Sequence, residues 1–149
     1  MAASKRSLFA GVAIVFGAGF LLGNAVDGIQ DAQAQSADRV FELRTYTAPE
    51  GKLPNLQARF RDHTLRLFES HGMTNIGYWT PQDEPNSANT LTYIIAHPSR
   101  EAAAANWGAF RSDPEWQEVS RASQVDGRII VSGGVVSTFL DPLDFSPIK

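Results

Sequence analysis

Residues 40–47 read VFELRTYT, an alternation of β-forming residues that predicts a strand. Its side chains alternate between two faces, with Phe41, Leu43 and Thr45 on one and Glu42, Arg44 and Tyr46 on the other. A strand with apolar or aromatic residues on both faces is expected to be covered on both. We therefore expect other parts of the protein to cover both faces of this strand.

The rest of the chain supplies a second, third and fourth strand with helices between them. After the turn at Gly51, a helix with Pro54 in its first turn is expected to end at Gly72. Further strands are predicted over 74–80, 90–97 and 129–140, and helices over 100–111 and 114–124. Gly133-Gly134 interrupts the last strand and suggests a bulge or bend there. The order is βαββαβ. It predicts an α+β, ferredoxin-like fold, a four-stranded antiparallel sheet with helices on one face.

The predicted helices leave the other face of this sheet uncovered. Tyr78 and Trp79 are expected to point to opposite faces, as are Tyr93 and Ile94, so that face is apolar as well. The chain has no spare helices to cover it. We therefore expect a homodimer that forms through the sheet face and encloses a cavity.

The first 34 residues differ in character from this domain. Lys5 and Arg6 precede residues 8–26, which carry no charge, and Ala32-Gln33-Ala34 follows as a small-residue cleavage site. This order predicts a signal peptide over 1–34 and a periplasmic or secreted protein. The predicted linker is 35–39, the domain 40–140 and the C-terminal tail 141–149. The alternative is a retained membrane anchor through residues 8–26.

Composition excludes several classes of function. The chain has a net charge of −3 and no block of basic residues, so binding to nucleic acid is not expected. It has no cysteine, which excludes disulfides and thiolate metal sites. His63 and His71 lie about 12 Å apart along one helix, too far to bind one metal ion. We expect no metal and no cofactor.

Several short motifs, taken together, resemble those of the NIPSNAP family of dimeric α+β barrels. They are FELRTY at 41–46, GKL at 51–53, Phe60, His63, HGM at 71–73, GYW at 77–79 and DPEW at 113–116. The likeness covers nearly all of residues 40–140. It implies a ferredoxin-like subunit and a dimer, and it implies no particular reaction.

Two residues of the first strand are candidate ligand contacts. Arg44 could bind an anionic group through its forked guanidinium, with Tyr46 beside it in the cavity. The alternative is a structural ion pair between Arg44 and Glu42, buried at the dimer interface.

Asn75, Trp79 and His63 are the remaining candidates. Asn75 and Trp79 are expected on one side of the second strand, and His63 could act as an acid or base. Dimeric α+β barrels include cofactor-free enzymes that use such residues, although each could equally serve packing. The sequence favours a small-ligand-binding or interaction module. The alternative is a cofactor-independent monooxygenase or isomerase acting on a small aromatic or apolar substrate.

Overall fold

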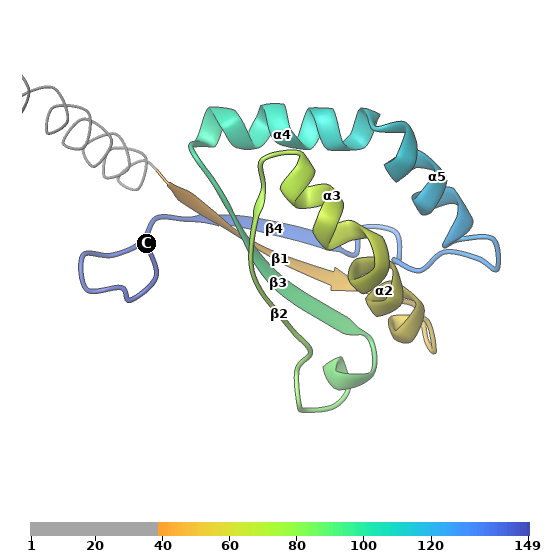
Figure 1. The fold of residues 1–149 in the computed structure, drawn as a ribbon. Helices are drawn as coiled ribbons and strands as arrows, with labels where there is room; N and C mark the ends of the chain where they lie inside the picture. The colour runs from red at the N-terminus through yellow and green to blue at the C-terminus, as the bar shows by residue number, and fades with distance from the viewer. Residues whose placement is uncertain (1–38) are drawn as a thin grey trace, which may run out of the picture. The chain divides into compact units, whose positions relative to one another are not determined.

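The computed structural model describes residues 39–149 (Figure 1). The predicted signal peptide, its alternative as a membrane anchor, and most of the predicted linker lie outside these residues. Within 39–149, no helix is long and apolar enough to cross a membrane. The elements follow in the order β1 Val40–Thr47, α2 Leu53–Arg59, η1 Phe60–Thr64, α3 Leu65–Ser70, β2 Thr74–Trp79, η2 Asn86–Ala88, β3 Thr90–His97, α4 Arg100–Ser112, α5 Pro114–Ala122 and β4 Val135–Leu140.

The strands form one antiparallel sheet in the order β2-β3-β1-β4, as the predicted ferredoxin-like fold requires. The β1 strand is central, pairing with β3 on one side and β4 on the other. Helices α2, α3, α4 and α5 all lie on one face (Figure 1). The predicted fold class is confirmed.

The starts of α4 and α5 are fixed by the caps that the sequence indicates. The Ser99 hydroxyl accepts a hydrogen bond from the Ala102 N–H, and the Asp113 carboxylate accepts bonds from the N–H groups of Glu115 and Trp116. Pro114 occupies the first turn of α5, where a missing N–H costs nothing. The chain therefore changes direction between the two helices within one residue.

The last strand is shorter than predicted. We expected a strand over 129–140, but β4 begins at Val135. Gly133 has a φ of +74°, and the Gly134 N–H closes a turn onto the Val131 carbonyl at 3.0 Å. This turn separates β4 from Ile129, which is buried in the core instead of extending the sheet.

The core lies between the sheet and the helices, and aromatic rings dominate it. Phe60 is its centre: its ring lies 5.1 Å from Tyr93, 5.8 Å from Tyr46 and from Tyr78, and 6.1 Å from Phe68. Most of these pairs meet edge to face, the arrangement that aromatic quadrupoles favour. These rings hold the helix that begins at Leu53 against the sheet.

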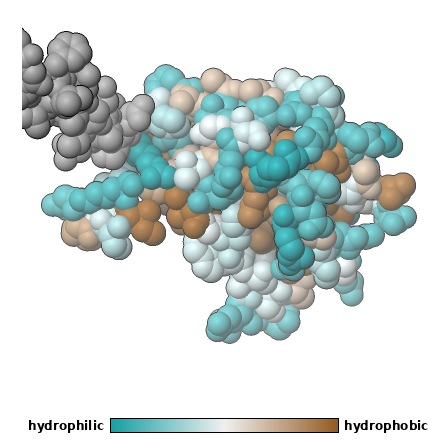
Figure 2. Space-filling view, viewed as in Figure 1, coloured by the Kyte–Doolittle hydropathy of each residue, from teal (hydrophilic) through white to brown (hydrophobic). Residues whose placement is uncertain are grey.

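No helix of residues 39–149 lies on the opposite face of the sheet. Trp79, Val136 and Leu140 are exposed there. The C-terminal tail covers only the end near Phe41, and its own Phe145 is also exposed. Figure 2 shows apolar side chains gathered around the tail. An apolar sheet face with little cover is what the sequence predicted.

Candidate functional site

The helix over residues 53–70 contains a π-helical turn, η1, in its middle. The Leu65 N–H bonds to the Phe60 carbonyl, and the Thr64 hydroxyl donates to the Arg59 carbonyl at 3.2 Å. Phe60 and Thr64, the first and last residues of this turn, are both buried. Such turns are frequent at functional sites. This turn positions the candidate site.

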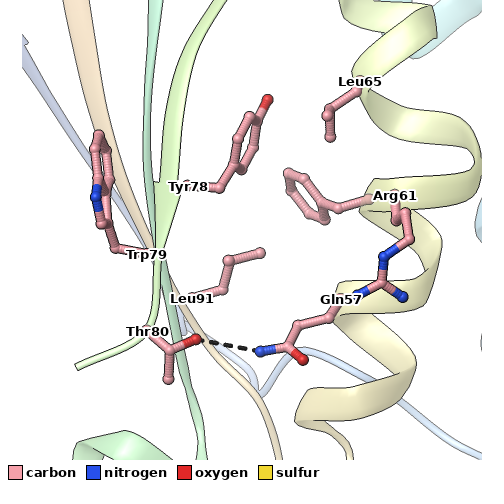
Figure 3. A pocket seen from close by; sticks show the side chains of 8 residues that line it. Gln57, Arg61, Leu65, Tyr78, Trp79, Thr80 and Leu91 are labelled. Carbon is pink, nitrogen blue, oxygen red and sulfur yellow. Dashed lines mark hydrogen bonds between the residues drawn. The ribbon is translucent and has the colours of Figure 1, made fainter. Parts of the chain in front are cut away.

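A cavity of about 360 Å³, here called the outer cavity, lies between this helix and the edge of the sheet (Figure 3). It is lined by Gln57, Phe60, Arg61, Leu65, Tyr78, Trp79, Thr80 and Leu91. The Gln57 amide donates to the Thr80 hydroxyl at 3.2 Å across the opening. The volume is at the lower end of the range for small-molecule sites.

A second cavity of about 170 Å³, here called the inner cavity, lies on the other side of Phe60. Its lining is Tyr46, Arg59, Phe60, Thr64, Phe68, Phe110, Trp116, Ser120, Gln124 and Ile130. Aromatic residues supply half of this lining. The Tyr46 hydroxyl accepts a hydrogen bond from the Tyr93 hydroxyl at 3.0 Å. This cavity combines an apolar wall with a few polar groups.

Arg59 is the charged group of the inner cavity and is only 6% exposed. Its guanidinium carbon lies 5.1 Å from the centre of the Trp116 ring, and Nη1 donates to the Ser123 hydroxyl at 3.4 Å. Its Nε is buried without a partner. Among residues 39–149, no carboxylate forms a salt bridge with it. Burial lowers the pKa of Arg59, and nearby Tyr46 and Tyr93 oppose that effect.

Arg44, in contrast, has a carboxylate partner: its Nη1 pairs with Glu42, although its Nε, like that of Arg59, is buried without a partner. The two side chains meet at 2.5 Å, which confirms the intrachain pair that their i, i+2 spacing predicts. That alternative placed the pair at the dimer interface, and this part of it is wrong. The pair faces the helices, with the Arg44 guanidinium 4.2 Å from the Trp107 ring centre, and does not lie on the sheet face expected to form a dimer. Arg44 therefore belongs to the packing between β1 and α4.

Glu42 is the centre of a buried polar network. Its side chain is 1% exposed and accepts hydrogen bonds from Arg44 and Ser137 at 2.5 Å, Trp107 at 2.6 Å and His97 at 3.1 Å. Burial alone would raise its pKa. The bonds from His97, Ser137 and Trp107, with the charge of Arg44, instead lower the pKa of Glu42 to about 2. Glu42 is thus an ionised structural acceptor.

Asn75 and Trp79 lie on opposite sides of the sheet, contrary to the prediction. A β-bulge between Asn75 and Gly77 shifts the register by one residue, which reverses the side on which later residues project. Asn75 faces the helix and donates to the Leu65 carbonyl at 2.9 Å. Figure 3 shows Trp79 directed away from Tyr78 and the helix.

His63 does not enter either cavity. It is exposed on the outer side of the helix, in a shallow groove with Asp62 and Glu118. An unbroken α-helix would have placed it near the inward stripe of Leu56, Phe60 and Leu67. The π turn places Thr64 there instead. Within residues 39–149, no three His, Asp or Glu side chains come together as a metal site requires.

Of the predicted ligand contacts, only Tyr46 lines the inner cavity, whereas Trp79 is part of the outer one. Sequence analysis missed Arg59. A signal for it exists, because Arg59 follows Leu56 by three residues and directly precedes Phe60, so helical periodicity places it on the buried stripe. A charged side chain on a buried stripe normally requires a partner of opposite charge.

The fold defines a class of protein, the ferredoxin-like α+β domains found in dimeric α+β barrels. Within it, the profile of the NIPSNAP family matches residues 41–147. The chain therefore belongs to the NIPSNAP family.

Solved structures of similar fold come from bacteria. An uncharacterized NIPSNAP-like domain protein from Burkholderia xenovorans is 21% identical, with a TM-score of 0.63 over 74% of this chain and 90% of that chain. A NIPSNAP family protein with unknown function from Agrobacterium tumefaciens is 23% identical, with a TM-score of 0.63. The match covers 76% of this chain and 96% of that chain. A second NIPSNAP family protein from Agrobacterium tumefaciens is 23% identical, with a TM-score of 0.64. The match covers 74% of this chain and 99% of that chain. No curated protein matches the chain.

Proposed function

We propose that this NIPSNAP protein is an exported homodimer that binds a small, largely apolar ligand between its helices and its sheet. One observation carries the proposal, the pair of cavities on either side of Phe60. Both open to solvent, and small-molecule sites are usually clefts of this kind. They adjoin a π turn, a feature that is frequent at functional sites.

The chemistry of the cavity walls supports an apolar or aromatic ligand. Small-molecule sites combine predominantly apolar walls with a few polar groups that orient the ligand. Phe68, Phe110 and Trp116 supply such walls in the inner cavity, and the Tyr46 hydroxyl supplies a polar group. The outer cavity repeats the pattern with Leu65, Leu91 and the Gln57 amide.

The dimer is proposed from the exposed sheet face. Trp79 is 52% exposed and Val136 59%, on the two edge strands of the face that no described helix covers. Leu43 and Ile94 are partly exposed between these edges, and the apolar character of the face favours an interaction site. A second copy of the chain, packed sheet to sheet, would cover it. The proposal of export depends on the predicted signal peptide.

The alternative activity, a cofactor-independent monooxygenase or isomerase, has weaker support. It would require a proton acceptor beside the substrate. His63, the residue predicted for that role, lies on the outer surface of the helix. Ligand binding requires only the cavity walls that the structure contains.

Native mass spectrometry of the full-length chain, purified from its own cells without denaturation, tests the proposal. We expect a mass of twice the mature chain plus a bound small molecule. Two cavity-filling variants, Ser120→Leu in the inner cavity and Leu65→Trp in the outer one, act as matched controls. At least one of them should lose the added mass. A ligand-free protein, or equal retention in wild type and both variants, would show that the ligand-binding proposal is wrong.

A further inference from the structure

The inner cavity is lined by a buried cation that has no anionic partner among residues 39–149. Arg59 is 6% exposed, its Nε has no partner, and its one side-chain hydrogen bond is a long one, 3.4 Å, to Ser123. Building on the proposed small-ligand function, we propose that Arg59 binds the carboxylate group of a small aromatic acid in the inner cavity.

The neighbouring acids of the chain do not supply this anion. Glu118 lies in the same surface groove but is paired with Arg121 at 2.6 Å, and Asp62 is exposed there without a bond to Arg59. Charged groups that are buried are normally paired, since an unpaired one is costly. A carboxylate suits a guanidinium best, because two parallel N–H···O bonds can form.

The size of the cavity limits the rest of the ligand. Its volume of about 170 Å³ is close to that of engineered apolar cavities of about 150 Å³ that bind benzene. The walls are aromatic, and Trp116 lies against both the cavity and the Arg59 guanidinium. A single ring carrying one carboxylate, such as benzoate, matches this volume and this wall.

Tyr46 is placed to bind the same group. Its hydroxyl accepts the proton of Tyr93, so its own proton is free to be donated into the cavity that it lines. A charged guanidinium and a hydroxyl donor together would favour a carboxylate over a neutral polar group. Arg44 does not take this role, because it does not line the inner cavity and its charge is paired with Glu42.

The experiment compares two single-ring probes of similar size and different charge. Binding of benzoate and of benzyl alcohol to the full-length protein, cleared of bound ligand, is measured by isothermal titration calorimetry at neutral pH. We expect benzoate to bind about tenfold to a hundredfold more tightly than benzyl alcohol, the range for one charge-assisted contact. Arg59→Met should remove that preference while leaving benzyl alcohol binding within about twofold. Arg128→Met, which removes an exposed arginine outside the cavity, should behave as wild type.

Two further measurements keep the proposal testable if Arg59→Met does not fold. The preference of the wild-type protein for benzoate is informative by itself, and Tyr46→Phe should weaken benzoate binding while keeping the aromatic wall. Equal binding of both probes to wild type would overturn the carboxylate site but leave ligand binding in place. Failure of both probes to bind would also overturn it. The native mass experiment judges the proposed function separately, because it uses no added probe.

Discussion

Replacing Glu42 by glutamine tests whether the buried network between β1 and α4 is structural. Glutamine keeps the size of the side chain but removes its charge and one acceptor position. Arg44, His97, Trp107 and Ser137 all donate to the carboxylate, and each would lose part of its bonding. We expect a less stable protein whose cavities are unaffected.

The pKa gives the size of the effect. A fall from the ordinary value of 4.5 to about 2 in the folded protein corresponds to about 3 kcal/mol of stability at neutral pH. The folded state favours the ionised form. This contribution is therefore complete above pH 4.5 and is lost as the pH falls toward 2. By pH 3, roughly half of it should be gone.

Urea unfolding of the wild type and Glu42→Gln, followed at several pH values between 7 and 3, measures the difference in the free energy of unfolding. Titrating groups outside this network are common to both chains, so the pH dependence of the difference reports Glu42 and the network bonded to it. We expect about 3 kcal/mol at pH 7 and about half of that at pH 3. A difference that stays constant with pH, or that is absent at pH 7, would refute the assignment of an ionised, buried Glu42.

Four other outcomes can be checked directly. Phe60→Ala should cost about 3–5 kcal/mol in chemical unfolding, because a large buried ring is lost from the core; a midpoint like that of wild type would show that the ring is not buried. Ser99→Ala should cost about 1 kcal/mol through the loss of a helix cap, whereas Ser132→Ala, at an exposed turn, should cost almost nothing. Sedimentation should give twice the monomer mass, and Trp79→Asp should give the monomer if the open sheet face is the interface. N-terminal sequencing of the protein from its own cells should begin at Gln35, and a chain that retains residues 8–26 would indicate an anchor instead.

The sequence predicted the fold well because its signals are local. The bounds of β1 and β3 match the alternation of the sequence, and Ser99 and Asp113 cap their helices as expected. The start of β4 was missed because Gly133 forms a turn with positive φ, whereas the Ile and Val residues around it favour a strand. Propensity cannot show where a chain leaves a sheet.

The site was predicted less well because single-residue insertions reverse which side a residue faces. The bulge in β2 separates Asn75 from Trp79, and the π turn η1 moves His63 out of the helix–sheet layer. Neither insertion is visible as a change in the pattern of residue types along the sequence. Only the hydrogen bonds of the folded chain show where the extra residue sits.

The two buried arginines show a further limit on predicting side-chain partners from the sequence. The partner of Arg44 is two residues away in the sequence, so its role can be predicted from spacing. The surroundings of Arg59 depend on α5, which supplies Trp116, and on Ser123 at the C-cap of that helix, both far from Arg59 in the sequence.

The motif DPEW at 113–116 determines where α5 lies. Asp113 caps the helix and bonds to His71 at 2.7 Å, and Trp116 stacks on Phe110 with ring centres 4.3 Å apart. A motif that identifies the family therefore also builds one wall of the inner cavity. It follows that changes in this motif should alter ligand binding as well as folding, even though none of its charged side chains lines the cavity.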